Sequence, residues 1–492
     1  MTALGESISA LRGVRIAGPG REHLIDDDPV DIHILEGRII DIAPAGALPV
    51  RGASIDAEGA WAVPGLWDSH IHTLQWALAS ERASLHDAGS AIEAAARMSD
   101  VAPLADGRRI GTGFRDALWP DDPSLEILDA ATGETETYLV NADVHSVWLN
   151  SAALRREGFA SADGMLREED AFEISKRLNA VEPAHGDRAV AAAGRVAAGR
   201  GVTGAVDYDM AWNAEAWARR IGSGFSSQRV EFAIYPADLV RAIAAGLRTG
   251  DALEGAGGLV HVGPLKVISD GSLGTRTAAC TRPYPGDDSD HGVLNVSPDE
   301  LIDLLTTATG AGLATAIHAI GDRAVSSALD AVTATGATGS IEHAQLIRHA
   351  DIARIARLGL VASVQPQHAL DDRDLVDGYW LAQTSLGYPM ASLLLAGGEV
   401  RLGSDAPVAP LDPWRTIAAA VHRTDDDRAP WHPEESLTLD QALAASTRGS
   451  VRPGERADLV MCGADPRTAS AAVLREMPVH ATLLEGRLTH LS

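Results

Sequence analysis

The sequence predicts a (β/α)₈ barrel with a smaller second domain, and three observations lead to this prediction. Eight short β-rich runs follow one another along the chain, each closed by turn residues. Stretches of helical character, rich in Ala, Leu and Arg, lie between most of these runs. Polar side chains able to bind a metal end several of the runs, and a (β/α)₈ barrel carries its active site at that end of its strands.

The runs expected to form the barrel strands are 62–72, 204–208, 230–236, 264–270, 313–320, 340–345, 360–367 and 400–405. Clear helical stretches between them cover 298–310, 322–335 and 349–358. Strands that alternate with helices in this way are typical of a parallel sheet that closes on itself.

The first connection is too long for one barrel helix, because about 130 residues separate the first two runs. We therefore expect an insertion at about 75–195 that caps the barrel mouth, within a barrel spanning 63–449. The flanks, 1–62 and 450–492, contain further β-rich pieces. The similar fragments Glu36-Gly37-Arg38 and Glu485-Gly486-Arg487 indicate tight hairpin turns. Both termini are therefore expected to build one small β-sandwich domain.

The first run ends in His70-Ile71-His72 after an apolar segment. Side chains two apart in a strand point to the same face, so both imidazoles can bind one metal ion. A lone His-x-His pair is a weak signal. Further polar residues strengthen it, because they end other runs in the same manner: Lys266, Asp270, His318, His343 and Asp405.

Composition narrows the class of protein. The 492-residue chain has a formal net charge of −27, which argues against nucleic acid as a partner. No apolar run approaches the roughly 18 residues of a membrane span, and the N-terminus lacks the features of a signal peptide. Cys280 and Cys462 form no CxxC pair, so any metal must be held by His and carboxylates. A cytoplasmic enzyme with a small-molecule substrate, no nucleic-acid partner and no membrane is the expectation.

Several motifs together make the chain resemble the amidohydrolase superfamily, specifically its amidohydrolase-3 (YtcJ-like) group of metal-dependent hydrolases. They are PGLWDSHIH, GTGFRDALWP, HSVWLNSAAL, GMLREE, KVISDGSLGTRTAA, AIHAIGDRAV, IEHAQL and GSDAPV, and they cover nearly the whole chain. The chain departs from the family near its end, where only residues 448–453 remain of a usually longer stretch.

The resemblance implies a metal site whose ligands are His70, His72, Lys266, His318, His343 and Asp405. Lys266 matches a position where many superfamily members carry a carboxylated lysine that bridges two metals. An unmodified Lys266 that pairs with Asp270 is the alternative. The expected cofactor is a divalent metal, most readily Zn²⁺, with one or two ions per chain. The resemblance is also compatible with a homodimer.

The expected reaction is hydrolysis of a C–N bond in an amide, N-formyl compound or cyclic amide. Asp405 would move the proton, and His343 or His145 would hydrogen-bond the developing oxyanion. Three alternatives stay open: a mononuclear deaminase, a lactonase or ester hydrolase of the same superfamily, and a non-catalytic scaffold or regulator. Candidate substrate contacts are Arg276, Trp119, Tyr208 and Gln367, at positions expected near the barrel mouth.

Overall fold

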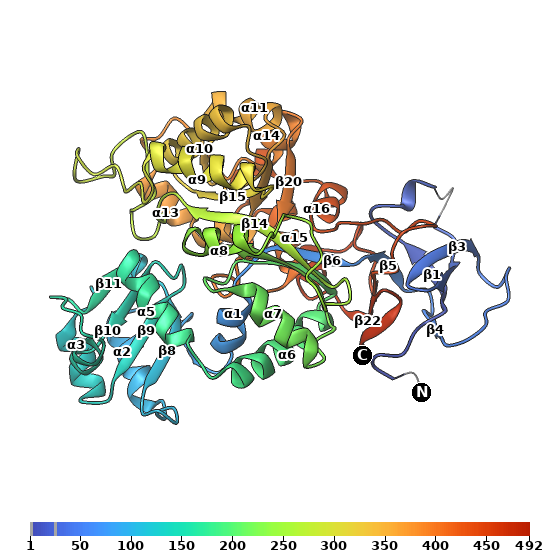
Figure 1. Ribbon diagram of the computed structural model, residues 1–492, viewed down its shortest axis with the longest axis horizontal. Coiled ribbons are helices and arrows are strands. Elements are labelled where there is room, and N and C mark those ends of the chain that lie inside the picture. The colour runs from blue at the N-terminus through green and yellow to red at the C-terminus, as the bar shows by residue number, and fades with distance from the viewer. Residues whose placement is uncertain (1–2, 24–26) are drawn as a thin grey trace.

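A barrel of parallel strands forms the centre of the molecule (Figure 1). The computed structural model describes residues 3–23 and 27–492. The strands are β6 (Leu66–Ile71), β12 (Val202–Asp207), β13 (Arg229–Ile234), β14 (Val260–Ile268), β15 (Thr315–Ala319), β16 (Gly339–His343), β18 (Val361–Val364) and β20 (Glu399–Leu402). They pair in this order, all parallel, in one 8-stranded sheet. Each expected run contributes one strand, so the predicted barrel is confirmed.

The two edge strands of this sheet, β6 and β20, meet at their carboxyl ends. The Asp405 amide donates to the His70 carbonyl at 2.7 Å, and the His72 amide donates to the Ala406 carbonyl at 2.9 Å. These bonds run between the segments that carry three of the expected ligands, His70, His72 and Asp405. Closure of the barrel therefore brings these side chains together, although they are far apart in the sequence.

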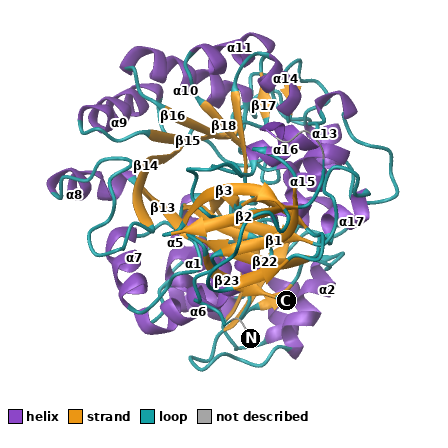
Figure 2. Ribbon diagram, turned by 90° about the vertical axis from the view of Figure 1, so that its right-hand side faces the viewer, coloured by secondary structure: helices purple, strands orange, loops and turns teal. Residues whose placement is uncertain are grey.

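Helices surround the barrel (Figure 2). They are α1 (Thr73–Ala79), α6 (Pro183–Gly199), α7 (Asn213–Gly222), α8 (Leu239–Ala244), α9 (Pro298–Gly310), α10 (Asp322–Thr335), α11 (His349–Arg357), α12 (Pro366–Asp371), α13 (Arg373–Tyr379), α14 (Met390–Leu395), α15 (Pro413–His422), α16 (Leu439–Ala445) and α17 (Ala471–Arg475). Local sequence sets their ends: Ser297 and Glu300 form a capping box at the start of α9, and Gly336 ends α10 with φ 69°. Within the part of the chain described, no helix combines the length and apolar character needed to cross a membrane.

The first expected run is divided at Gly65 into two strands of different sheets. Its first half, β5 (Trp61–Pro64), pairs with β21 (Leu459–Cys462) of the terminal domain, and only β6 enters the barrel. A Cβ at Gly65 would lie 2.2 Å from Thr203 Oγ1, so only glycine fits where the chain passes from one sheet to the other. The run is continuous in hydrophobicity because both halves are buried.

The termini build one mixed sheet that lies beside the barrel, at the right in Figure 1. Its order is β23 (Arg487–Leu491), β22 (Val479–Leu484), β21, β5, β1 (Ala10–Ile16), β2 (Val30–Leu35) and β3 (Arg38–Pro44), with β4 (Ser54–Asp56) on β1. The two halves of the expected sandwich are thus continuous through β1, which pairs with β2 and β4 near its start and with β5 at its end. Buried side chains such as Leu11, Ile32 and Leu459 form their common core.

A second small sheet fills the long first connection (Figure 1). Its order is β11 (Met165–Arg167), β10 (Ser146–Leu149), β9 (Thr137–Asn141), β8 (Arg109–Phe114) and β7 (Ala83–Ser84). The helices of this insertion are α2 (Ala91–Asp100), α3 (Leu125–Thr132), α4 (Ser151–Glu157) and α5 (Glu169–Asn179). Trp148, Phe114 and Leu139 belong to its own buried core. The remaining short pair, β17 (Leu346–Ile347) with β19 (Leu386–Gly387), follows the barrel strand β16.

Candidate metal centre

One pocket at the carboxyl ends of the barrel strands contains all six expected metal ligands. His70 and His72 stand at the end of β6, His318 and His343 in β15 and β16, Lys266 in β14, and Asp405 three residues after β20. The insertion supplies part of the same pocket wall, including His145. Residues from five barrel strands or their following loops thus converge on one space.

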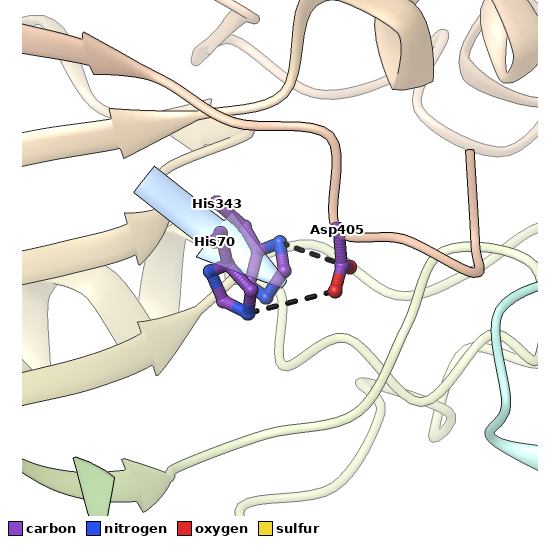
Figure 3. A group of neighbouring side chains, drawn as sticks. All are labelled: His70, His343 and Asp405. Atoms are coloured by element: carbon purple, nitrogen blue, oxygen red, sulfur yellow. Dashed lines mark ion pairs between the residues drawn. The ribbon is translucent and has the colours of Figure 1, made fainter. Parts of the chain in front are cut away.

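Three of these side chains form a compact cluster (Figure 3). One ligand atom each from His70, His343 and Asp405 lies within 4.8 Å of the others, and all three residues are buried. Asp405 Oδ1 lies 3.5 Å from His70 Nε2 and 3.4 Å from His72 Nε2. The backbones of Asp405 and His343 adopt φ of 59° and 69°, a conformation that is costly for residues other than glycine. The turns that aim these side chains are therefore strained.

Fixed acceptors set the tautomer of three histidines. His70 Nδ1 donates to Glu342 Oε2 at 2.6 Å, and His343 Nδ1 donates to Gln365 Oε1 at 2.9 Å. His318 is held the other way round, because its Nε2 donates to the Gly271 carbonyl at 3.2 Å. A neutral imidazole has one donor and one acceptor nitrogen. The lone pairs left for a metal are therefore on Nε2 of His70 and His343 and on Nδ1 of His318.

The electrostatics favour the neutral, metal-binding form of these rings. Burial holds the pKa of His70, His318 and His343 well below the ordinary value of 6.5, and in each case neighbouring cationic groups, among them Lys266, lower the pKa further. Asp405 Oδ1 is buried and has no hydrogen-bond partner among the described residues. The imidazole lone pairs of His318 and His343, that of His70 facing Lys266 Nζ at 3.4 Å, and the Asp405 carboxylate oxygen make a donor set that suits a divalent metal.

Lys266 reaches the same cluster from inside the barrel. Its Nζ lies 3.4 Å from His70 Nε2 and 4.3 Å from the centre of the Tyr208 ring. Burial lowers the pKa of Lys266 to about 8, against the opposing effect of the Glu342 and Asp405 carboxylates. The lowered pKa increases the share of uncharged amine near neutral pH, and the uncharged amine is the form that reacts with CO₂.

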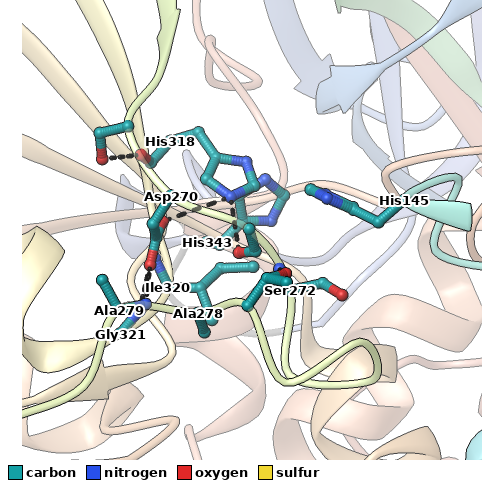
Figure 4. Close-up of polar contacts among 12 residues, drawn as sticks. His145, Asp270, Ser272, Ala278, Ala279, His318, Ile320, Gly321 and His343 are labelled. Carbon is teal, nitrogen blue, oxygen red and sulfur yellow. Dashed lines mark hydrogen bonds and ion pairs between the residues drawn. The ribbon is translucent and has the colours of Figure 1, made fainter. Parts of the chain in front are cut away.

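Asp270 has a different role from the alternative expected for it as a partner of Lys266. Its carboxylate accepts three backbone amides, from Ala279 at 2.9 Å, Ile320 at 3.0 Å and Gly321 at 2.8 Å (Figure 4). Its Oδ1 also lies 3.5 Å from His318 Nε2. Asp270 thus ties the loop after β14 to the turn after β15 and helps to fix the His318 ring.

His145 enters the pocket from the insertion, and Glu168 orients it. His145 Nδ1 lies 3.1 Å from Glu168 Oε2, and its ring centre lies 5.7 Å from that of His318. The other oxygen of Glu168 accepts from the Thr277 hydroxyl at 2.5 Å, so Glu168 connects the insertion to the loop after β14. Burial alone would lower the pKa of His145, but the Glu168 carboxylate outweighs it and raises the pKa above 6.5.

The four expected substrate contacts are not among the residues that line this pocket. Trp119 packs on Phe114 and donates to the Ala88 carbonyl inside the insertion. Gln367 donates to Asp371 and Asp425, and the Arg276 guanidinium lies over the Tyr379 ring. Tyr208 is buried beneath His70, with its hydroxyl donating to Glu342 at 3.2 Å. These side chains contact other residues, so position along the sequence did not identify the residues that line the pocket.

Two residues that support the cluster were missed at the level of sequence. Glu342 and Gln365 fix the rings of His70 and His343, and both are almost completely buried. A charged residue in the apolar strand β16, directly before His343, was the available signal for Glu342. Gln365 has no such signal, because a polar residue after a strand is ordinary.

Comparisons with known proteins agree with this architecture. The model of the Amidohydrolase family (amidohydrolase-3) matches residues 53–490. The chain belongs to the amidohydrolase family. The predicted resemblance is thereby confirmed, and membership supports a hydrolase.

Individual relatives are similar over most of the chain. "Protein LONG AFTER FAR-RED 3" of Arabidopsis thaliana is 27% identical, covering 87% of this chain and 83% of its own length. "Putative amidohydrolase YtcJ" of Bacillus subtilis (strain 168) is 26% identical, covering 89% and 90%. "N-substituted formamide deformylase" of Arthrobacter pascens is 28% identical over a shorter region, 47% of this chain and 46% of its own. A solved structure, an uncharacterized metal-dependent hydrolase from Pyrococcus horikoshii OT3, covers 94% and 99% at 24% identity with TM-score 0.77, which supports the fold.

Proposed function

We propose that this protein is a metal-dependent hydrolase that cleaves the C–N bond of an amide, N-formyl compound or cyclic amide. The observation that carries the proposal is the cluster of His70, His343 and Asp405, whose ligand atoms lie within 4.8 Å of one another. The similarity to an N-substituted formamide deformylase supports a C–N bond as the target, although that protein matches only 47% of this chain.

His70, His72, His318, His343 and Asp405 would hold the metal, which we propose to be Zn²⁺, with one or two ions per chain. When bound, such an ion lowers the pKa of water and polarises a carbonyl group. Lys266 is proposed to add CO₂ at Nζ, forming a carbamate and releasing one proton. Its lowered pKa supports this step, because the reaction needs the uncharged amine.

Asp405 is proposed to move the proton of the reaction. Its buried Oδ1, free of hydrogen bonds to described residues, is available to accept a proton from the attacking water. The water oxygen bonds to the carbonyl carbon, the C–N bond breaks, and Asp405 returns the proton to the departing nitrogen. Atoms and charge balance, because one water becomes the acid hydroxyl and the amine hydrogen.

His145 is proposed to stabilise the oxyanion that develops on the carbonyl oxygen, a role in which His343 is the alternative. Glu168 fixes the Nδ1 side of the ring, which leaves Nε2 as the donor toward the pocket. Since His145 comes from the insertion, the insertion would contribute directly to the reaction.

The deciding experiment combines metal analysis with turnover. Elemental mass spectrometry on protein purified without chelators or metal-binding tags is expected to give one or two equivalents per chain, two if Lys266 is carboxylated. Release of amine from a panel of N-formyl and N-acetyl amines should disappear with chelator and return with Zn²⁺. The proposal would be overturned if the purified protein contained no metal and bound none when metal was added. It would also be overturned if the metal-loaded protein hydrolysed only lactones or deaminated heterocycles.

A further inference from the structure

The wall of the pocket beyond the metal cluster carries an excess of negative charge. Apart from His145, which is paired with Glu168 at 3.1 Å, its charged members are four carboxylates, Asp116, Asp143, Asp371 and Asp372, and one guanidinium, Arg115. Arg115 is already engaged, because its Nη2 lies 2.8 Å from Asp371 Oδ2 and its Nη1 lies 3.9 Å from Asp372 Oδ1. One cation does not balance four anions, so this wall attracts positive charge.

Two of these carboxylates come from the insertion, where Asn141 bonds to both residues. The Asn141 amide group donates to Asp116 Oδ1 at 2.8 Å, and its oxygen accepts the Asp143 backbone amide at 3.2 Å. Burial raises the pKa of Asp116, and the charge of Asp143 raises it further. A cation placed between them would relieve that repulsion.

A second, independent feature of the same wall is a pair of buried polar atoms without partners. Gln345 is 3% exposed and His368 is 6% exposed, and both line the pocket. Gln345 Oε1 and His368 Nε2 make no hydrogen bond to any described residue. Buried polar atoms are rarely left unpaired, so Gln345 Oε1 calls for a bound group, whereas His368 Nε2 lies 4.0 Å from Asp405 Oδ2 of the metal cluster. Because a carboxamide oxygen only accepts, the group beside Gln345 must donate an N–H or O–H.

Tyr388 links the backbone of Gln345 to one of the carboxylates. Its backbone amide donates to the main-chain carbonyl of Gln345 at 2.5 Å, and its hydroxyl donates to Asp372 Oδ2 at 2.7 Å. The second oxygen, Asp372 Oδ1, lies 3.9 Å from Arg115 Nη1, beyond hydrogen-bonding distance. We call Gln345 and Asp372 the acceptor corner of the pocket.

Building on the proposed function, we propose that the acceptor corner binds a cationic, N–H-bearing group of the substrate, such as a protonated amine or a guanidinium. Gln345 and Asp372 accept its hydrogen bonds, and Asp116 and Asp143 of the insertion add negative potential to the same pocket. The substrate class is therefore an amide or N-formyl compound with a positively charged tail. A carboxylate tail would face four acidic side chains and find Arg115 already paired.

The test uses binding, so that it does not depend on turnover. Three sulfonamides that resist hydrolysis serve as probes: N-(5-aminopentyl)methanesulfonamide is cationic, N-pentylmethanesulfonamide is neutral and 5-(methanesulfonamido)pentanoate is anionic. Isothermal titration calorimetry on the metal-loaded protein is expected to show the cationic probe binding about tenfold or more tightly than the neutral one, with the anionic probe weakest. Binding of the neutral or anionic probe as tight as the cationic one would overturn the proposal.

Variants locate the effect. Asp372→Asn should reduce the preference for the cationic over the neutral probe about tenfold, and Gln345→Glu should increase it. Asp374→Asn is the matched control, because Asp374 lies two residues further on, in the first turn of α13, but is exposed and paired with Arg428 at 2.9 Å. Should Asp372→Asn fail to fold, Gln345→Glu still decides. A preference that neither variant alters refutes the acceptor corner. Retained cation preference with no hydrolysis of any N-acyl compound would refute the proposed reaction and leave this inference standing.

Discussion

The hydrogen bond between Glu342 and His70 gives a quantitative test of the metal centre. Glu342 is fully buried and its Oε2 lies 2.6 Å from His70 Nδ1, a short charge-assisted bond. Glu342→Gln keeps the shape and leaves an amide oxygen able to accept the same hydrogen bond without charge. A bond to a charged group contributes about 1.5–3 kcal/mol and a neutral one about 0.5–1.5 kcal/mol. The change therefore weakens, by roughly 1–1.5 kcal/mol, the hydrogen bond that orients His70 and raises the basicity of its ring.

Since about 1.4 kcal/mol corresponds to a factor of ten, Zn²⁺ affinity should fall roughly tenfold in Glu342→Gln. Glu342→Ala, which removes the acceptor, should lose affinity toward the upper end of the roughly 10–100-fold range known for such supporting partners. The assay is competition against a chromophoric chelator at fixed pH. Glu399→Gln is the control, because Glu399 is exposed on β20 and pairs with its near neighbour Arg401 at 2.7 Å. If Glu342→Gln folds normally and its affinity stays within about twofold of the control, the reasoning fails.

Three further predictions concern Lys266, the insertion core and His145. In ¹³C-bicarbonate, the ¹³C NMR spectrum of the protein should show a carbamate resonance that is lost in Lys266→Ala. The control Lys176→Ala, which changes an exposed lysine, should keep the resonance, and a resonance unaffected by Lys266→Ala would contradict the assignment. Trp148→Ala should destabilise the protein by about 3–5 kcal/mol in urea unfolding, because the indole is completely buried; a loss below about 1 kcal/mol would refute this. The ¹H NMR titration of His145 should give a pKa above 6.5, because the Glu168 carboxylate favours the charged ring, and Glu168→Gln should lower that pKa. The pair's contribution to stability is then complete below the unfolded pKa and is lost as pH rises through the folded pKa. Equal pKa values in both proteins would contradict this prediction.

Much of the fold could be predicted because barrel strands are local features. A buried parallel strand is a short apolar run bounded by turn residues, and each of the eight expected runs yielded one strand of the barrel. The residues His318 and His343 stood out for the same reason, as polar groups in otherwise apolar strands. The run 62–72 was misjudged as one strand because burial on both sides of Gly65 hides the change of sheet.

The sequence by itself determined the order of the strands and which side chains stand at their carboxyl ends, because alternation and hydrophobicity act over a few residues. Only the tertiary structure decided which distant groups meet: Glu342 fixes His70 from 272 positions away, and Glu168 of the insertion reaches Thr277. Such contacts depend on barrel closure and on loop conformation, for which local sequence holds no signal. The same reason explains why Trp119 and Gln367 are not among the residues that line the pocket, whereas Gln345 and Asp372 line it.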